Sequence, residues 1–168
     1  MTAITSSSAP ITTTSARWAT PVHIAGAAML GLIGLAHLLV VHAFGGADTP
    51  EEEVINDLSA RTTTSMFEGG RQLSAFGLNT GYSVAMGLLA MLFGALVISA
   101  VRAAPQLIAR WSLFNGICVA AAGGAFWIAL LYFPEPAVAL SGLATLCFAA
   151  VFVAGNRVEQ HGQRPSSS

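Results

Sequence analysis

The chain has 168 residues, of which 54% are hydrophobic and only 9% are charged, and its net charge is −1. Soluble domains carry about 25% charged residues, so this composition is typical of a protein embedded in a lipid bilayer. A nucleic-acid-binding protein is excluded, because such proteins need a basic patch.

The N-terminal part of the chain joins a polar tail to a long apolar stretch. Residues 1–17 are rich in Ser and Thr and have too little apolar surface to fold. Residues 22–44 follow without a single charged side chain. This stretch exceeds the apolar region of a cleaved signal peptide, which has about 7–15 residues. We therefore expect a membrane span that is retained.

The loop that follows contains the start signal of a short helix. Thr49 can cap it, Pro50 suits its first position, and three glutamates complement the positive end of its dipole. Val54, Ile55 and Leu58 form one apolar stripe, which predicts a surface helix that ends near residue 60. Since its other face is acidic and repels anionic lipid, we expect the stripe to contact the protein's own outer surface.

The end of this loop leads into the second apolar stretch, residues 78–101. A helix that begins near Gly70 is expected to project beyond the bilayer. Glu68 and Arg71 are three residues apart, so a helical turn would bring them together as an ion pair. An exposed interfacial pair of this kind is common and contributes little to stability.

Two further apolar stretches, residues 112–133 and 137–154, are joined by a turn too short for anything but an antiparallel hairpin. Small residues recur along all four stretches at a spacing that allows helices to approach closely in lipid. The longest such series are Gly116, Ala120 and Gly124 in the third stretch, and Ala137, Ser141, Thr145 and Ala149 in the fourth; shorter ones are Ala27 with Gly31 and Ala90 with Gly94.

The four apolar stretches define the fold class. A bilayer-spanning helix needs about 20 apolar residues, so the sequence predicts an all-α, polytopic four-transmembrane-helix bundle over residues 18–156, with a short outer-surface helix in its first loop. Residues 157–168 form a second polar tail.

The arginines predict the orientation of this bundle. Five of the seven lie on one side of the membrane, at positions 17, 102, 110, 157 and 164, whereas Arg61 and Arg71 lie in the acidic loop on the other side. Short Arg-rich segments stay in the cytoplasm, so both termini should be cytoplasmic. The basic residues are all Arg, and Gly and Ala are abundant, which suggests a GC-rich bacterial gene. We therefore expect a multi-pass protein of a bacterial plasma (inner) membrane.

Polar side chains within the spans are the candidate functional residues. His37, Tyr82, Ser83 and Ser141 fall at similar depths in the outer half of the bundle. They could line a ligand pocket. Alternatively, they could form hydrogen bonds that hold the helices together.

Histidines also raise the question of a cofactor. His23 and His37 share one face of the first span and stand about 21 Å apart along it, a spacing that suits axial ligands to two haems. A haem would need a second histidine for each site, which only a homodimer could supply. Cys118 and Cys147 form no CxxC motif and no Cys/His metal spacing, so no metal site or catalytic residue is indicated and no bound cofactor is expected.

The order of these elements resembles a family of small uncharacterised bacterial four-helix membrane proteins. The resemblance covers residues 20–154 and rests on the His-rich first span, the segment MFEGGRQLS, the residues Asn79-Thr80-Gly81 and the FPEP turn. It implies the fold and no activity.

Three hypotheses about function follow. The first is a non-enzymatic accessory or interaction subunit that contacts other membrane proteins or forms a homo-oligomer. The second is a redox (haem-binding) or lipid-modifying protein, and the third is a small homo-oligomeric transporter. The spans contain no carboxylate, which a proton-coupled transporter usually needs.

Overall fold

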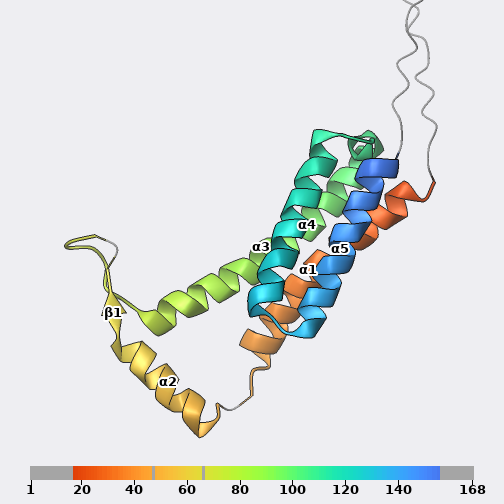
Figure 1. The fold of residues 1–168 in the computed structure, drawn as a ribbon. Helices are drawn as coiled ribbons and strands as arrows, with labels where there is room; N and C mark the ends of the chain where they lie inside the picture. Colours follow the sequence, from red (N-terminus) through yellow and green to blue (C-terminus); the bar gives the residue numbers. More distant parts are fainter. Residues whose placement is uncertain (1–16, 47, 66, 156–168) are drawn as a thin grey trace, which may run out of the picture.

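The structure is a computed structural model that describes residues 17–46, 48–65 and 67–155. The elements in chain order are α1 (Ala19–His37), the π-helix η1 (Leu38–Ala43), α2 (Pro50–Arg61), β1 (Thr63–Thr64), β2 (Leu73–Ser74), α3 (Ala75–Ala103), the 3-10 helix η2 (Pro105–Ile108), α4 (Leu113–Tyr132) and α5 (Glu135–Ala154). The predicted all-α fold is confirmed (Figure 1). Except for Arg17, the predicted tails lie outside the described residues.

Four of these segments are long and apolar enough to cross a membrane. They are α1 continued by η1 (25 residues), α3 (29 residues), α4 and α5 (20 residues each). At 1.5 Å per residue α3 is about 43 Å long, which exceeds the roughly 30 Å thickness of the hydrocarbon core. The other helix, α2, is short and carries three glutamates in its first turn.

The long helices pack around α1. This helix lies against α3 on one side and α5 on another, and α4 packs mainly on α5 (Figure 1). The start of α1 and the end of α5 lie at the same end of the bundle, and the α4–α5 turn lies at the other. The N-terminal part of α3 leaves the bundle and continues through the β1–β2 pair to α2. We call this projecting segment, residues 50–65 and 67–82, the outer arm.

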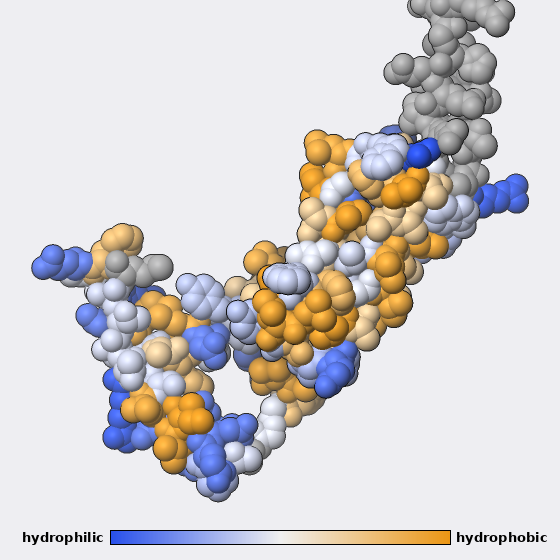
Figure 2. All heavy atoms as spheres, in the orientation of Figure 1, coloured by the Kyte–Doolittle hydropathy of each residue, from blue (hydrophilic) through white to orange (hydrophobic). Residues whose placement is uncertain are grey.

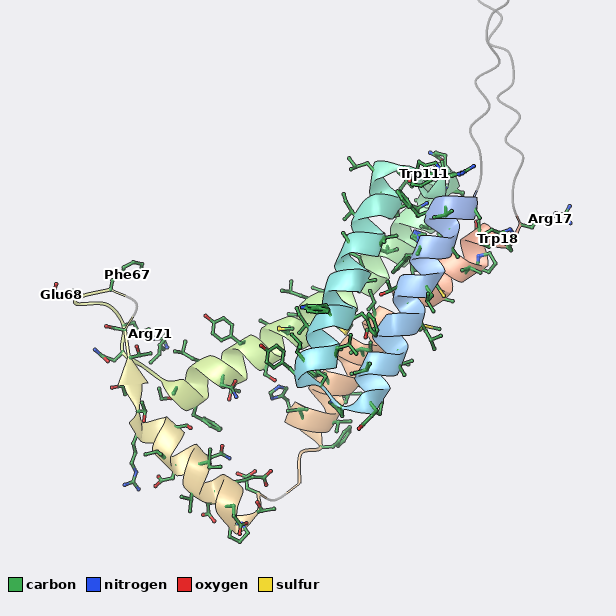
Figure 3. The ribbon with its side chains drawn as sticks, in the orientation of Figure 1. Arg17, Trp18, Phe67, Glu68, Arg71 and Trp111 are labelled. Atoms are coloured by element: carbon green, nitrogen blue, oxygen red, sulfur yellow. The ribbon has the colours of Figure 1, made fainter. Side chains whose placement is uncertain are left out.

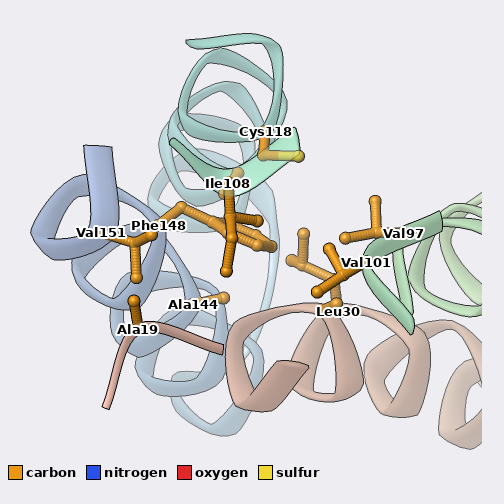
Figure 4. Close-up of a cluster of buried hydrophobic side chains, with 11 residues drawn as sticks. Ala19, Leu30, Val97, Val101, Ile108, Cys118, Ala144, Phe148 and Val151 are labelled. Atoms are coloured by element: carbon orange, nitrogen blue, oxygen red, sulfur yellow. The ribbon is translucent and has the colours of Figure 1, made fainter. Parts of the chain in front are cut away.

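The core lies at the end of the bundle away from the outer arm. Ile108 of η2 and Phe148 of α5 are fully buried at its centre, and Val101 of α3 closes one side (Figure 4). The connection between α3 and α4 is held against α5 by a hydrogen bond from the Trp111 N–H to the Phe152 carbonyl oxygen, 3.2 Å long. The short η2 segment therefore contributes a buried side chain to the core and contacts α1, α3 and α4.

The closest helix contact is between α1 and α3, at Gly31 and Gly94 of the two shorter series, and not along the longer Gly116–Ala120–Gly124 series. Ala120 is exposed, and a β-carbon built on Gly124 would have no neighbour within 4 Å. The buried side of α4 includes Cys118 and Ala122. Each lies two residues beyond a member of the predicted series, or about 200° further around the helix at 100° per residue. The third-span prediction is therefore wrong for Ala120 and Gly124, whereas a β-carbon built on Gly116 would lie 3.7 Å from the ring of Phe152 on α5.

The predicted start of α2 is confirmed. The Thr49 hydroxyl oxygen accepts a hydrogen bond from the Glu52 N–H at 3.3 Å, and the Thr49 N–H donates to Glu52 Oε2 at 2.8 Å. The expected contact of its apolar stripe with the protein's own surface is wrong. Val54, Ile55 and Leu58 are 69%, 62% and 66% exposed, and Figure 2 shows apolar side chains on the surface of the outer arm.

The segment before α3 also differs from the prediction. Gly69 has a φ of +75°, which ends any helical turn, and α3 begins only after Ser74, whose hydroxyl oxygen accepts a hydrogen bond from the Gly77 N–H. Glu68 and Arg71 therefore do not form the expected ion pair (Figure 3).

Candidate functional site

The first of the four long apolar segments changes its helical pitch next to a histidine. Residues 38–43 form the π-helix η1, which ends with a hydrogen bond from the Phe44 N–H to the Leu39 carbonyl oxygen at 2.8 Å. In an α-helix, residues five apart are separated by about 140° around the axis. A π-helix joins residues i and i+5 in adjacent turns, so His42 comes to lie near His37. Their ring centroids are 5.7 Å apart.

Both histidines face the same hydroxyl group. His37 Nε2 lies 2.8 Å from Ser83 Oγ, and His42 Nε2 lies 3.0 Å from the same oxygen. A serine hydroxyl donates one hydrogen bond and accepts others, so it can donate to one imidazole and accept from the other. His37 and Ser83 are half-buried, whereas His42 is exposed. The contact expected between His37 and Ser83 is therefore present, and it includes a third residue.

The other two predicted cluster residues lie elsewhere. Tyr82 is 64% exposed on the outer arm. Ser141 is buried, but its hydroxyl donates to the Ala137 carbonyl oxygen of its own helix at 2.7 Å. Neither residue is hydrogen-bonded to His37 in the part of the chain that the structure describes. Of the four predicted residues, only His37 and Ser83 lie together, and His42 joins them. We call these three residues the His37–Ser83–His42 cluster.

His23 has a different environment at the opposite end of α1. Its side chain is fully buried, with the Phe148 ring centroid at 4.7 Å and the Phe114 ring centroid at 5.8 Å from its own. Neither ring nitrogen has a hydrogen-bond partner among the described residues. His23 thus faces α4 and α5, while His37 faces α3. A haem shared with a second copy would require both rings to leave these positions.

Other potential ligands are dispersed. Within residues 17–46, 48–65 and 67–155, no group of three or more His, Cys, Asp or Glu side chains converges on one point. Cys118 and Cys147 are free thiols. His42 is the residue that sequence reasoning missed in this cluster, because no periodic pattern predicts a π-helix.

Comparison with known proteins identifies no relative of this chain. No protein-family model, curated protein or solved structure matches the chain. The function of the chain has to be inferred from its own geometry.

Proposed function

We propose that the chain is a non-enzymatic accessory subunit of a larger membrane-protein assembly, and that the outer arm contacts the partner. The observation that carries this proposal is the apolar stripe of α2. Val54, Ile55 and Leu58 are all more than 60% exposed, and no residue of α2 is buried. Full burial of one such side chain contributes about 1.5–3 kcal/mol, so a partner that covers the stripe gains a substantial free energy.

The charges around this stripe indicate the chemistry of the partner. α2 carries Glu51, Glu52 and Glu53 in its first turn, and its Arg61 is paired with Asp57 at 2.6 Å. An anionic lipid surface would be repelled by this helix. A protein surface that combines an apolar patch with Lys or Arg side chains at its edge would complement it. We therefore propose another membrane protein, not lipid, as the occupant.

The distribution of charged residues between the two ends of the bundle supports a location of the outer arm outside the cytoplasm. Among the described residues, Arg17, Arg102 and Arg110 lie at the bundle end where α1 begins, and the acidic α2 lies beyond the other end (Figure 1). Under the positive-inside rule, we propose a multi-pass protein of a bacterial inner membrane with cytoplasmic termini. The outer arm would then meet its partner on the external side.

Site-specific photocrosslinking in intact membranes tests the proposed contact. A photoreactive amino acid replaces Leu58 within the stripe, and in a matched control it replaces the exposed Ala60, about 200° around the same helix. We expect a discrete protein adduct from position 58 that is at least several-fold weaker from position 60. Equal adducts from both positions, adducts with lipid only, or adducts with a second copy only would contradict the proposal.

A further inference from the structure

We propose that His37, His42 and Ser83 form a binding site for a divalent transition-metal ion of the Cu²⁺, Ni²⁺ or Zn²⁺ class, with the two imidazole Nε2 atoms as its principal ligands. Two imidazoles of the first long segment converge there on one side chain of α3. The site does not involve α2, so it is independent of the proposed contact with a partner.

The distances place both nitrogens close to coordination geometry. Each Nε2 atom lies within 3.0 Å of Ser83 Oγ, on the end of α1 and on η1 respectively. Imidazole nitrogen binds zinc at about 2.0–2.1 Å, so two ligand atoms of one tetrahedral zinc ion are about 3.3 Å apart. The Nε2–Oγ distances of 2.8 and 3.0 Å are shorter than this by only a few tenths of an ångström. His42 is exposed, so its ring can make this adjustment at little cost in packing.

The donor set selects the kind of ion. Imidazole nitrogen suits Zn²⁺, Cu²⁺ and Ni²⁺, whereas Mg²⁺ and Ca²⁺ prefer carboxylate and carbonyl oxygens. Two nitrogens and a hydroxyl leave further coordination positions for water or an added ligand. Among these metals the affinity of a nitrogen site is highest for Cu²⁺, so Cu²⁺ is the most sensitive probe.

The backbone supports a specialised role for this cluster. A π-helical turn is rare and occurs frequently at functional sites. Here it spans Leu38–Ala43 and is the feature that brings His42 to the side of α1 where Ser83 lies. His37 joins the end of α1 to α3 through Ser83. His42 brings a second imidazole nitrogen to the same oxygen, so two metal-ligating atoms converge there.

Cu²⁺ titration of the full-length protein in detergent, purified without a histidine tag, tests the proposal. Electron paramagnetic resonance should show superhyperfine coupling to two nitrogens in the wild type and to one in His37→Gln and in His42→Gln. Each variant should bind Cu²⁺ at least tenfold more weakly. His161→Gln, which changes a histidine remote in sequence, should leave the spectrum and the affinity unchanged.

If His37→Gln or His42→Gln does not fold, the spectra of the wild type and of His161→Gln decide the matter together. An ion bound to two nitrogens in a 1:1 complex supports the site. The absence of nitrogen coupling in the wild type, or a two-nitrogen spectrum that survives in a folded His42→Gln variant, would overturn it. An excess of Zn²⁺ should displace Cu²⁺ and replace the two-nitrogen spectrum by that of free Cu²⁺, whereas Mg²⁺ at the same concentration should not.

Discussion

Gly94 of α3 and Gly31 of α1 meet backbone to backbone. A β-carbon built on Gly94 would lie 2.8 Å from the Cα of Gly31, closer than real side chains approach. One turn away, a β-carbon on Gly34 would overlap the carbonyl oxygen of Gly87. In lipid, helices associate through such close packing because burial of apolar surface gives no advantage over contact with acyl chains. These glycines therefore set the distance between α1 and α3.

Replacement of Gly94 by Leu should destabilise the protein strongly. The new side chain would have to push α1 away from α3, and overpacking of this kind costs about 1–3 kcal/mol or more. We expect a lower midpoint of thermal unfolding in detergent, measured by the loss of monodisperse protein. Gly124→Leu is the matched control, because the space around Gly124 is open; an equal loss in both variants would contradict the assigned contact.

The sequence was sufficient to predict the number and the approximate limits of the long helices. Residues 22–44 and 78–101 were expected as spans, and the structure has Ala19–Ala43 and Ala75–Ala103. Hydropathy is a local property that needs no knowledge of the neighbours, since a charge-free run of this length has few alternatives to a membrane helix. The cap at Thr49 is likewise encoded within four residues.

The rotation of each helix about its axis could not be predicted in the same way. Every span is apolar all round, so the sequence contains no polar stripe that would mark the face turned outward. Gly124 and Gly94 look alike in the sequence, yet only Gly94 lies in a close contact. The same ambiguity applies to Tyr82 and Ser83, of which only Ser83 lies against His37. The π-helix that brings in His42 is a change of helical pitch, which no periodic pattern predicts.

Reporter fusions should establish the orientation. Because the arginines are concentrated at one end of the bundle, a reporter active only outside the cytoplasm should be inactive when fused after Gln160 and active when inserted between residues 45 and 60. A reporter that fluoresces only in the cytoplasm should give the reverse pattern. An active external reporter at the C-terminus would mean that the positive-inside rule fails for this chain.

Phe148→Ala should leave a cavity that the bundle cannot close. The ring is fully buried among α1, η2 and α3 residues and lies edge-on to His23. Removal of a buried Phe side chain costs about 3–5 kcal/mol. Leu146→Ala on the same helix provides the control, since Leu146 is 67% exposed. Thermal unfolding in detergent should show a large shift for the first variant and little change for the second.

His23→Leu should raise the thermal stability. Both ring nitrogens of His23 are buried without a hydrogen-bond partner among the described residues, and an unsatisfied buried polar group costs about 1–3 kcal/mol. Leucine occupies a similar volume and removes that cost. The same change at His37 should lower the stability, because His37 is hydrogen-bonded to Ser83. If His23→Leu is instead destabilised as strongly as His37→Leu, the buried imidazole must have a polar partner.

The cap of α2 should respond to acid. The pKa of the Glu52 carboxyl lies below its ordinary value of 4.5, because the carboxylate accepts a hydrogen bond from the Thr49 backbone N–H and interacts with the Thr49 hydroxyl. Because folding lowers this pKa, the cap contributes its full stabilisation of α2 at any pH above the ordinary pKa of the carboxyl group. This contribution is lost as the pH falls through the lowered pKa of the folded state. The N-terminal turn of α2 should therefore fray in acid.

The amide resonance of Thr49 in an isotope-labelled sample reports this transition directly. Its chemical shift should change with pH along a single titration curve whose midpoint lies below 4.5. Glu52→Gln should abolish the curve, because the amide can still accept the Thr49 N–H but carries no titrating group. Glu51→Gln should leave it in place, since Glu51 precedes the residue that closes the capping box. A Thr49 resonance that stays constant through this pH range in the wild-type protein would contradict the capping geometry.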